Sequence, residues 1–329
     1  MSTEVPAGAP AATRALGLGP IGLSGWDGFD PTRTRGRGWS DLWRSYRTAV
    51  RLGWEMEANW TDPLLFFIHS IAQPVSSALI LIVMLEIVGG AASRELRGYV
   101  VTGSALWSIV ISGVGGLAWS VLDDRETYRM LRYLYVSPSD FLVVLLGRGT
   151  ARIAIGAMGA SITLAVGIAL LGIPFDPGRV NWPLLAVSMV LGLAAIVAGG
   201  VLMAAVCLHA RQEAWSYPEA VAGALFLVTG AVFPLAVLPS AVQLVGLAMP
   251  LTWWLAAVRL ALFPDGPSSL AGTGTAWAAL AGPVPPDAGQ TLFALLVTGA
   301  LGMLAAAIVF RASERRAKDR GLLDQTTGS

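Results

Sequence analysis

The sequence predicts an all-α membrane protein with six transmembrane helices, and its composition is the first reason. Apolar residues make up 55% of the 329 residues, charged residues make up only 13%, and the mean hydropathy is +0.65. The charged residues gather in a few clusters separated by long uncharged stretches. An ordinary soluble domain carries about 25% charged residues and cannot bury this much apolar surface.

Six uncharged windows are long enough to cross a bilayer as helices. A helix needs about 20 apolar residues to span a hydrocarbon core of about 30 Å, and a charge at its centre costs about 2.5 to 3.5 kcal/mol. The windows are residues 63–85, 98–122, 153–175, 180–208, 220–258 and 288–310. We therefore expect a six-helix transmembrane domain over residues 63–311.

The N-terminal part predicts a tail followed by an interfacial helix. Residues 1–38 are rich in Gly, Ala, Pro and Thr, which is typical of a disordered tail. Residues 39–62 carry aromatic and apolar residues at helical spacing, with arginines of the same period on a neighbouring face: Trp39, Trp43, Tyr46, Val50 and Trp54. This pattern predicts an amphipathic helix on the inner leaflet. A helix packed against a soluble partner is the alternative.

The distribution of basic residues predicts the orientation of the windows. Of the 22 Lys and Arg residues, only Arg94, Arg97, Arg179 and Arg259 fall on the side of the membrane opposite the N-terminus. Because cytoplasmic segments carry an excess of Lys and Arg, both termini are expected in the cytoplasm. Residues 312–329 then form a basic cytoplasmic tail.

The stretch DDRETYRMLRYLYVSPSD, residues 123–140, is a dense polar segment between the second and third windows. Asp123 or Asp124 can cap a short helix here, and Ser137 before Pro138 ends it, because the residue before proline leaves helical geometry. On that helix the arginines share one side, and apolar and aromatic residues share another. This favours a docking element, while a helix held by lipid headgroups is the alternative.

Prolines interrupt the fifth window. At 39 residues, window 220–258 is too long for one helix and too short for two ordinary helices with a loop. Irregular backbone at membrane depth requires protein around it. We expect a fifth crossing that ends near Pro239, then re-entrant helices in the outer leaflet over residues 240–262. Trp253 and Trp254 are expected at the interface, and Arg259 at the outer boundary. Proline-kinked ordinary helices are the alternative.

These two segments resemble the permease subunit of ABC-2 type ABC transporters, the bacterial exporters of drugs, polysaccharides and lipid-linked glycans. The family pattern after the second span is matched by Asp124, Arg125, Glu126, Thr127, Leu131, Leu134, Ser137 and Pro138. The later family signature is matched by Gly230, Phe233, Pro234, Leu238, Pro239, Pro250, Leu251, Thr252, Trp253 and Arg259. Tyr128 departs from the family, since many members carry glycine there.

The resemblance implies a multi-pass subunit of the bacterial inner membrane that exports an apolar drug, a lipid or a glycoconjugate. Residues 123–138 would be a coupling helix that docks on a cytoplasmic ATPase through Asp124, Arg125, Glu126, Tyr128, Arg129, Leu131, Arg132, Tyr135 and Pro138. A second permease chain, identical or related, would complete the path, lined by Phe67, Gln73, Ser77, Phe226, Thr229 and Phe233. The re-entrant motif would comprise Pro234, Pro239, Pro250, Thr252, Trp253 and Arg259.

The chain itself is not expected to be an enzyme or to hold a cofactor. A Walker loop requires Gly-Lys followed by Ser or Thr, and the only lysine, Lys318, precedes Asp319. ATP and Mg²⁺ would therefore be bound by a separate ATPase. His69 and His209 are distant histidines that make no metal site, and no nucleic-acid signature is present. The alternative functions are a proton-coupled secondary transporter, in which His69 would be the ionisable group, and a non-transporting scaffold.

Overall fold

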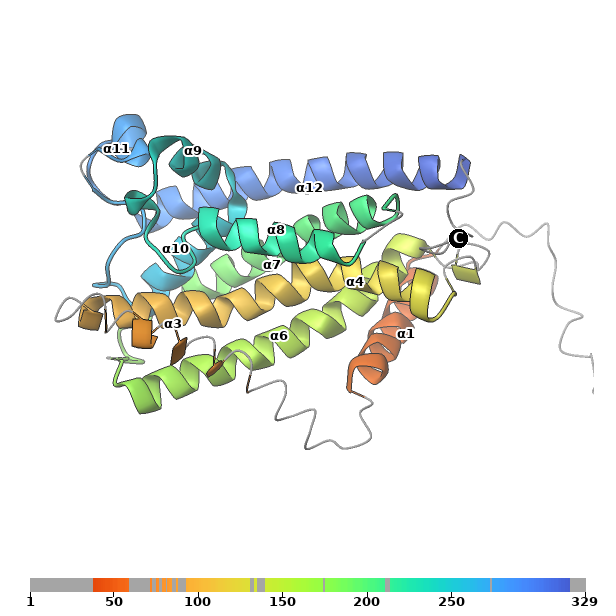
Figure 1. The fold of residues 1–329 in the computed structure, drawn as a ribbon, viewed down its shortest axis with the longest axis horizontal. Helices are drawn as coiled ribbons and strands as arrows, with labels where there is room; N and C mark the ends of the chain where they lie inside the picture. The colour runs from red at the N-terminus through yellow and green to blue at the C-terminus, as the bar shows by residue number, and fades with distance from the viewer. Residues whose placement is uncertain are drawn as a thin grey trace, which may run out of the picture. The chain divides into compact units, whose positions relative to one another are not determined.

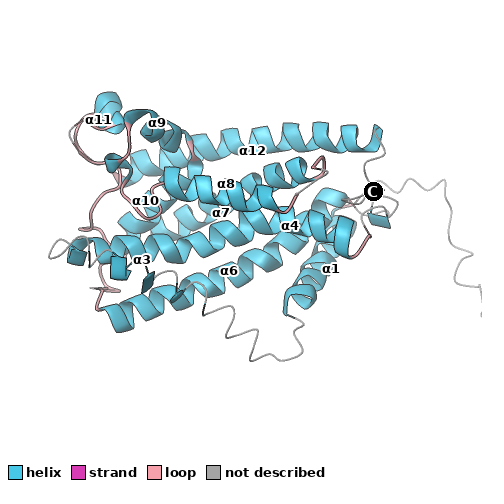
Figure 2. Ribbon diagram, viewed as in Figure 1, coloured by secondary structure: helices cyan, strands magenta, loops and turns pink. Residues whose placement is uncertain are grey.

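The computed structural model describes residues 38–58, 72, 75–76, 79–80, 82–84, 87, 93–130, 133–134, 140–173, 175–210, 214–272 and 274–319. Every regular element within this part of the chain is helical, as Figure 2 shows. Ser40–Ser329 form one compact unit, distinct from Met1–Trp39. The all-helical prediction is confirmed. The predicted N-terminal tail and most of the first window, 63–85, lie outside the described residues.

Long helices lie side by side in the unit, with α9 and α11 at one end and α1 at the other (Figure 1). We call these the α11 end and the α1 end. The elements are α1 (Trp39–Ala58), α3 (Ser93–Val110), η4 (Ile111–Gly115), α4 (Gly116–Leu122), η5 (Asp123–Thr127), α6 (Phe141–Leu171), α7 (Trp182–Cys207), α8 (Ser216–Val228), η6 (Leu235–Val237), α9 (Ser240–Ala248), α10 (Pro250–Leu262), α11 (Ala276–Ala281) and α12 (Ala288–Asp319).

Four helical runs in the described residues are long and apolar enough to cross a membrane: Leu96–Thr127, Phe141–Ala169, Trp182–Cys207 and Ala288–Ala317. The pair α9 and α10 is bent by 84° and would make a fifth run if it formed one span. Helix α8 has 13 residues and is shorter than a crossing requires. The described residues therefore support a multi-pass membrane protein but do not reproduce the predicted count of six.

Helix α1 has the amphipathic character that its sequence predicts. Ala49 is buried, and Gly53 lies so close to α6 that an added Cβ would come within 3.0 Å of the Arg148 Cα. The Tyr46 hydroxyl lies 2.9 Å from the Thr150 hydroxyl on α6. Trp39, Trp43 and Trp54 lie beside this contact, on the same side of the helix as Tyr46, and are exposed. The helix ends at Ala58, and the remainder of the predicted segment to residue 62 is not described.

The helical run Leu96–Thr127 corresponds to the second predicted window, and we call it the second helical run. It does not stop where the charged residues begin. Elements α3, η4, α4 and η5 follow one another without a break, and the two η segments are π-helical turns. Asp123 and Asp124 lie inside this run, and neither caps a new helix. The predicted helix start at Asp123 or Asp124 is therefore wrong: the run extends through the first charged residues because their side chains find partners inside the protein.

Helix α6 begins twelve residues before the third window that the sequence predicts. Asp140 caps it, with its carboxylate accepting a hydrogen bond of 3.0 Å from the Leu142 amide. Gly172 ends it in the left-handed region at φ 62°. The start predicted at residue 153 is wrong because Arg148 and Arg152 sit within the helix, paired to carboxylates. The fourth window, 180–208, matches α7, whose cap is Asn181.

Helix α8 ends at Val228, eleven residues before Pro239, where the fifth crossing is predicted to end. The Thr229 hydroxyl donates to the Leu225 carbonyl, and Gly230 adopts a φ of 71°. Pro234 then precedes the short η6 turn, and Pro239 precedes α9. The predicted end near Pro239 is wrong, since the chain leaves helical geometry before it reaches either proline.

The bent pair contradicts the interfacial position predicted for its tryptophans. Pro250 is the first residue of α10, and both Trp253 and Trp254 are buried. The Trp253 indole donates a hydrogen bond of 2.8 Å to the Leu247 carbonyl, so its polar edge is satisfied without water. Trp254 packs against Gly192 of α7. Helix α10 is therefore anchored to α7 through Trp254.

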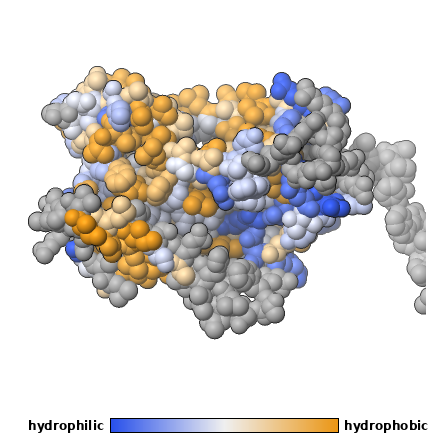
Figure 3. Space-filling model, viewed as in Figure 1, coloured by the Kyte–Doolittle hydropathy of each residue, from blue (hydrophilic) through white to orange (hydrophobic). Residues whose placement is uncertain are grey.

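Helix α12 extends beyond the sixth window, to Asp319, so the first part of the predicted basic tail is helical. One face packs on α7 through Leu295, Ala306 and Phe310, while the other exposes a row of large apolar side chains. In Figure 3 hydrophobic surface covers much of the middle and the α11 end, and hydrophilic surface gathers toward the α1 end. This distribution is typical of a bundle surrounded by lipid.

The contact between Gly192 and Trp254 leads to a stability prediction. In Gly192→Ala, the added methyl group would overlap the indole ring of Trp254, which is fully buried and cannot move aside. We expect a loss of about 1 to 3 kcal/mol, measured as a lower unfolding temperature in detergent. Gly223→Ala is the matched control, because nothing lies within 4 Å of its added Cβ. Equal unfolding temperatures for the two variants would contradict this packing.

Candidate functional site

A buried ion pair links the end of the second helical run to α6. The carboxylate of Asp124 accepts a hydrogen bond from the Arg148 guanidinium, and each side chain is only 3% exposed. The same guanidinium also reaches the Ser120 carbonyl at 3.4 Å. A charge in such surroundings is tolerated only when it is paired, so the two residues hold η5 against α6.

The neighbouring arginine links η5 to α7. Arg125 donates to the carbonyls of Cys207 at 3.0 Å and Ala210 at 2.8 Å. These carbonyls belong to the last turn of α7 and to the residues after it, where no helical donors are left. The positive charge also lies at the favourable end of the α7 dipole. In a third hydrogen bond, of 2.8 Å, Arg125 donates to the carboxylate of Glu126.

A third arginine brings α1 into the same network. Arg152 of α6 contacts Asp123 at 2.8 Å and Glu57 of α1 at 2.5 Å. Four helical elements therefore meet at the α1 end: α1, η5 and α6 are joined by ion pairs, and α7 is joined to η5 by the hydrogen bonds of Arg125. We call this set the α1-end network: Glu57, Asp123, Asp124, Arg125, Glu126, Arg148 and Arg152.

The residues predicted to contact an ATPase divide into two groups. Asp124 and Arg125 are buried and point into the bundle, so in this structure they do not form an outer surface. Glu126, Tyr128 and Arg129 are exposed, and Tyr128 is 49% exposed. The chain turns at Arg129, whose φ of 50° lies in the left-handed region. The other four, Leu131, Arg132, Tyr135 and Pro138, lie outside the described residues.

Four residues of this region are not among the site residues that the sequence predicts: Glu57, Arg148, Arg152 and Tyr133. Arg148 and Arg152 were assigned to the loop before the third window, although two arginines four residues apart would share one face of a helix. That spacing was the available signal. Tyr133, which is 61% exposed, lies just after the turn at Arg129 and was also not selected.

The residues predicted to line a path do not form one surface in the described part of the chain. Phe226 packs against Trp107 with ring centroids 4.8 Å apart, and Thr229 is buried within the chain. Phe233 is exposed. The three from the first window, Phe67, Gln73 and Ser77, and the alternative proton carrier His69 lie outside the described residues.

At the α11 end, α3 and α10 together hold the unwound backbone after α8. The Arg259 guanidinium donates to the carbonyls of Gly230 at 2.9 Å and Ala231 at 2.6 Å, and lies 3.5 Å from the ring centre of Tyr99. The Tyr99 hydroxyl donates to the Gly230 carbonyl at 2.6 Å. Arg259 is predicted at the outer boundary of the membrane, and its side chain is only 6% exposed within the protein. It is buried because the irregular backbone in this position needs buried donors.

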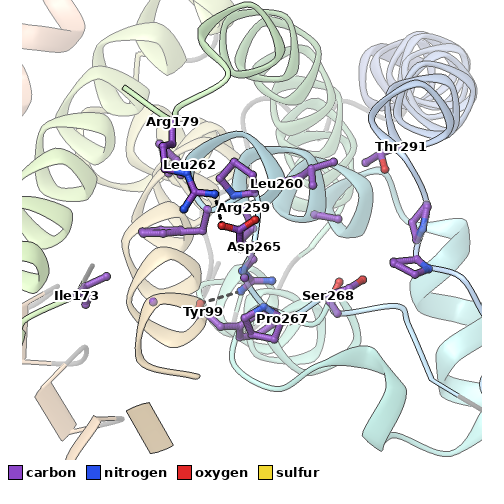
Figure 4. Close-up of a pocket in the computed structure, with 18 of the residues that line it drawn as sticks. Tyr99, Ile173, Arg179, Arg259, Leu260, Leu262, Asp265, Pro267, Ser268 and Thr291 are labelled. Carbon is purple, nitrogen blue, oxygen red and sulfur yellow. Dashed lines mark hydrogen bonds and ion pairs between the residues drawn. The ribbon is translucent and has the colours of Figure 1, made fainter. Parts of the chain in front are cut away.

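A cavity of about 630 Å³ opens beside this arginine (Figure 4). Its lining comes from the start of α3, the end of α10, the loops on either side of α11, and the connection between α6 and α7. Arg179 and Asp265 form an exposed ion pair at this cavity.

Comparison with known families identifies the chain. A family model described as ABC-2 type transporter matches residues 50–263, which is more than half of the chain. The chain belongs to the ABC-2 type transporter family. This match spans both segments on which the resemblance was based, residues 123–138 and 229–259, and confirms it. Comparison with curated proteins gives no match.

Membership in the ABC-2 type transporter family establishes the general role of the protein. An ABC-2 membrane domain is a transport component and not itself a catalyst. In this ABC-2 chain, the α1-end network includes the first residues of the earlier motif, Asp124, Arg125 and Glu126, and Arg259 closes the later signature onto α3. The two motifs thus lie at opposite ends of the bundle.

The buried pair of Asp124 and Arg148 leads to a second stability prediction. Asp124→Asn leaves a buried guanidinium without its counter-charge, so we expect a loss of about 3 to 5 kcal/mol. The double variant Asp124→Leu with Arg148→Met removes both charges and should recover much of that loss. Unfolding in detergent measures both.

The exposed pair of Arg179 and Asp265 provides the control. Because its side chains are 60% and 71% exposed, Asp265→Asn should change the stability by roughly 0 to 1 kcal/mol. If Asp124→Asn were no more harmful than Asp265→Asn, the ion pair would not organise the α1 end.

Proposed function

We propose that the chain is the permease subunit of an ATP-driven exporter, powered by an ATPase on a separate polypeptide. Membership in the ABC-2 family, over residues 50–263, is the observation that carries the proposal. The absence of a Walker loop in the sequence supports a separate ATPase, which would bind ATP and Mg²⁺.

The contact with the ATPase would be made by the turn that follows η5. Its exposed residues Tyr128, Arg129 and Tyr133 offer aromatic and cationic side chains, which are enriched in protein interfaces. Leu131, Arg132, Tyr135 and Pro138 belong to the same segment and would extend the contact. Asp124 and Arg125 would serve instead as anchors, since their side chains are directed into the bundle.

Through the α1-end network, a displacement of this turn by the ATPase would move the helices that are tied to it. Asp124 ties the turn to α6, Arg125 ties it to α7, and Asp123 ties it to α1 through Arg152. Separating the buried pair of Asp124 and Arg148 would leave an unpaired charge in apolar surroundings at a cost of about 3 to 5 kcal/mol, so the turn and α6 would move together. A rigid-body movement of α6 and α7 would then reshape the path between two permease chains.

The remaining parts of the proposal concern the membrane. Both termini would lie in the cytoplasm of a bacterial cell, which is supported by the distribution of arginines. The bent pair α9 and α10 would be a re-entrant element of the outer leaflet, because a bend of 84° at Pro250 suits a helix pair that enters and leaves on one side. The cargo would be an apolar drug, a lipid or a glycoconjugate.

Arg129→Glu tests the coupling contact. The charge reversal should abolish the stimulation of ATP hydrolysis by the permease in proteoliposomes that contain both subunits, since Arg129 is exposed and belongs to no ion pair that the structure describes. Arg315→Glu is the matched control, because Arg315 is also exposed and lies toward the α1 end of α12. It should leave the stimulation within roughly twofold of wild type. Equal stimulation by both variants, with normal membrane insertion, would refute the contact.

Single cysteines test the predicted orientation. In a background with Cys207→Ala, a cysteine at exposed Val284 should react with a membrane-impermeant maleimide added to intact cells. A cysteine at exposed Tyr133 should react only after the membrane is opened, because the two positions lie at opposite ends of the bundle. Labelling of Tyr133→Cys in intact cells would reverse the proposed topology.

A further inference from the structure

We propose that the cavity at the α11 end is a binding site for an anionic amphiphile, with Arg259 as the residue that receives a phosphate group. The cavity measures about 630 Å³, within the range of about 300 to 1,000 Å³ that is usual for small-molecule sites. The inference goes beyond the proposed export function, because it concerns binding at one end of the chain and does not depend on an ATPase.

Arg259 is a buried cation that lacks a counter-charge. It forms no ion pair with any carboxylate in the described part of the chain, and its partners are three carbonyls and the ring of Tyr99. These dipoles offset only part of a full charge. Its Nε atom is buried and has no hydrogen-bond partner. An unpaired guanidinium in such a place strongly favours a bound anion.

Phosphate is the anion that suits this residue best. Of the five N–H groups of the Arg259 guanidinium, three already donate to the carbonyls of Tyr99, Gly230 and Ala231, which leaves one N–H on Nη1 beside the buried Nε–H. The full positive charge strengthens a hydrogen bond from this remaining donor to a phosphate oxygen. Ser268 also lines the cavity, and its hydroxyl can donate to a phosphate oxygen. The site would therefore hold the headgroup with one cation and one hydroxyl.

The remaining walls favour a ligand with an apolar part. Ile173, Leu262, Phe263 and Pro267 line the cavity beside the polar groups, as Figure 4 illustrates for three of them. Such walls contribute nothing to the binding of a free inorganic ion. They fit the glycerol and the first carbons of a lipid chain, whose burial is favourable by about 0.8 kcal/mol per CH₂.

The other charged residues that line the cavity are either paired or exposed to solvent, so Arg259 is the residue that would bind an anion. Asp265 is neutralised by its ion pair with Arg179. Asp176 also lines the cavity, and its carboxylate accepts a hydrogen bond of 2.9 Å from the Gly178 amide in an exposed turn. The positive group is thus buried, whereas the negative groups are exposed to solvent.

The test uses the full-length chain in a neutral detergent, with dihexanoyl phosphatidic acid as the probe and calorimetry as the readout. The substitution Ser268→Glu adds a carboxylate to the lining while leaving Arg259 and its carbonyl partners in place. We expect it to weaken probe binding roughly tenfold or more. Ser240→Glu is the matched control, since Ser240 is exposed at the start of α9 and does not line the cavity. It should leave the affinity unchanged.

Two further binding measurements, with a neutral lipid and with inorganic phosphate, distinguish the possible ligands. Neutral dihexanoylglycerol should not bind, and inorganic phosphate should compete with the probe only at much higher concentration. Equal affinity for the neutral lipid, or equal probe affinity in Ser268→Glu and Ser240→Glu, would overturn the proposal. Competition by inorganic phosphate at the concentration of the probe would overturn the amphiphile and indicate a site for the free ion. Arg259→Gln, checked for its unfolding temperature, should also lose the probe.

Discussion

The structure depends on one constraint: a charge enclosed in an apolar bundle must have a partner, and each partner fixes the position of another helix. At the α1 end, Arg148 and Arg152 hold the end of the second helical run against α6 and connect it with α1. At the α11 end, Arg259 holds the unwound backbone after α8 against α3. Polar contacts thus close the two ends of a bundle whose middle is apolar, so neither end can move without breaking a buried charge contact.

The same constraint decides how much of the fold can be read from the sequence. Uncharged windows locate α7 and the apolar part of α12 well, because these helices contain no charge between their ends. They fail for α6, where Arg148 and Arg152 lie well inside the helix. A prediction from uncharged windows assumes that every arginine lies outside the membrane-spanning segment, in contact with water. Whether it is paired depends on residues such as Asp124, which comes 24 positions earlier and belongs to another helix.

Long-range contacts also determine features that local patterns assign incorrectly. Prolines predict a break in the fifth window, yet α8 ends before any of them, where Tyr99 and Arg259 bind the carbonyl of Gly230. These partners lie 131 and 29 positions away in sequence. The tryptophans of α10 illustrate the same difficulty. Their type favours an interface, but Gly192 on α7 leaves room for the Trp254 ring, and nothing near residue 254 reveals that space.

The motif after the second run combines two roles that a sequence pattern cannot separate. Asp124 and Arg125 match the family pattern together with Glu126, and all three were predicted as contacts with a partner. Their burial separates these roles: the nearly inaccessible side chains of Asp124 and Arg125 position the segment, whereas the exposed side chain of Glu126 lies where a partner could contact it. Substitution of either kind would reduce transport. An anchor that is lost lowers the stability of the isolated chain, while a lost contact leaves it unchanged, so the stability of the purified subunit distinguishes the two causes.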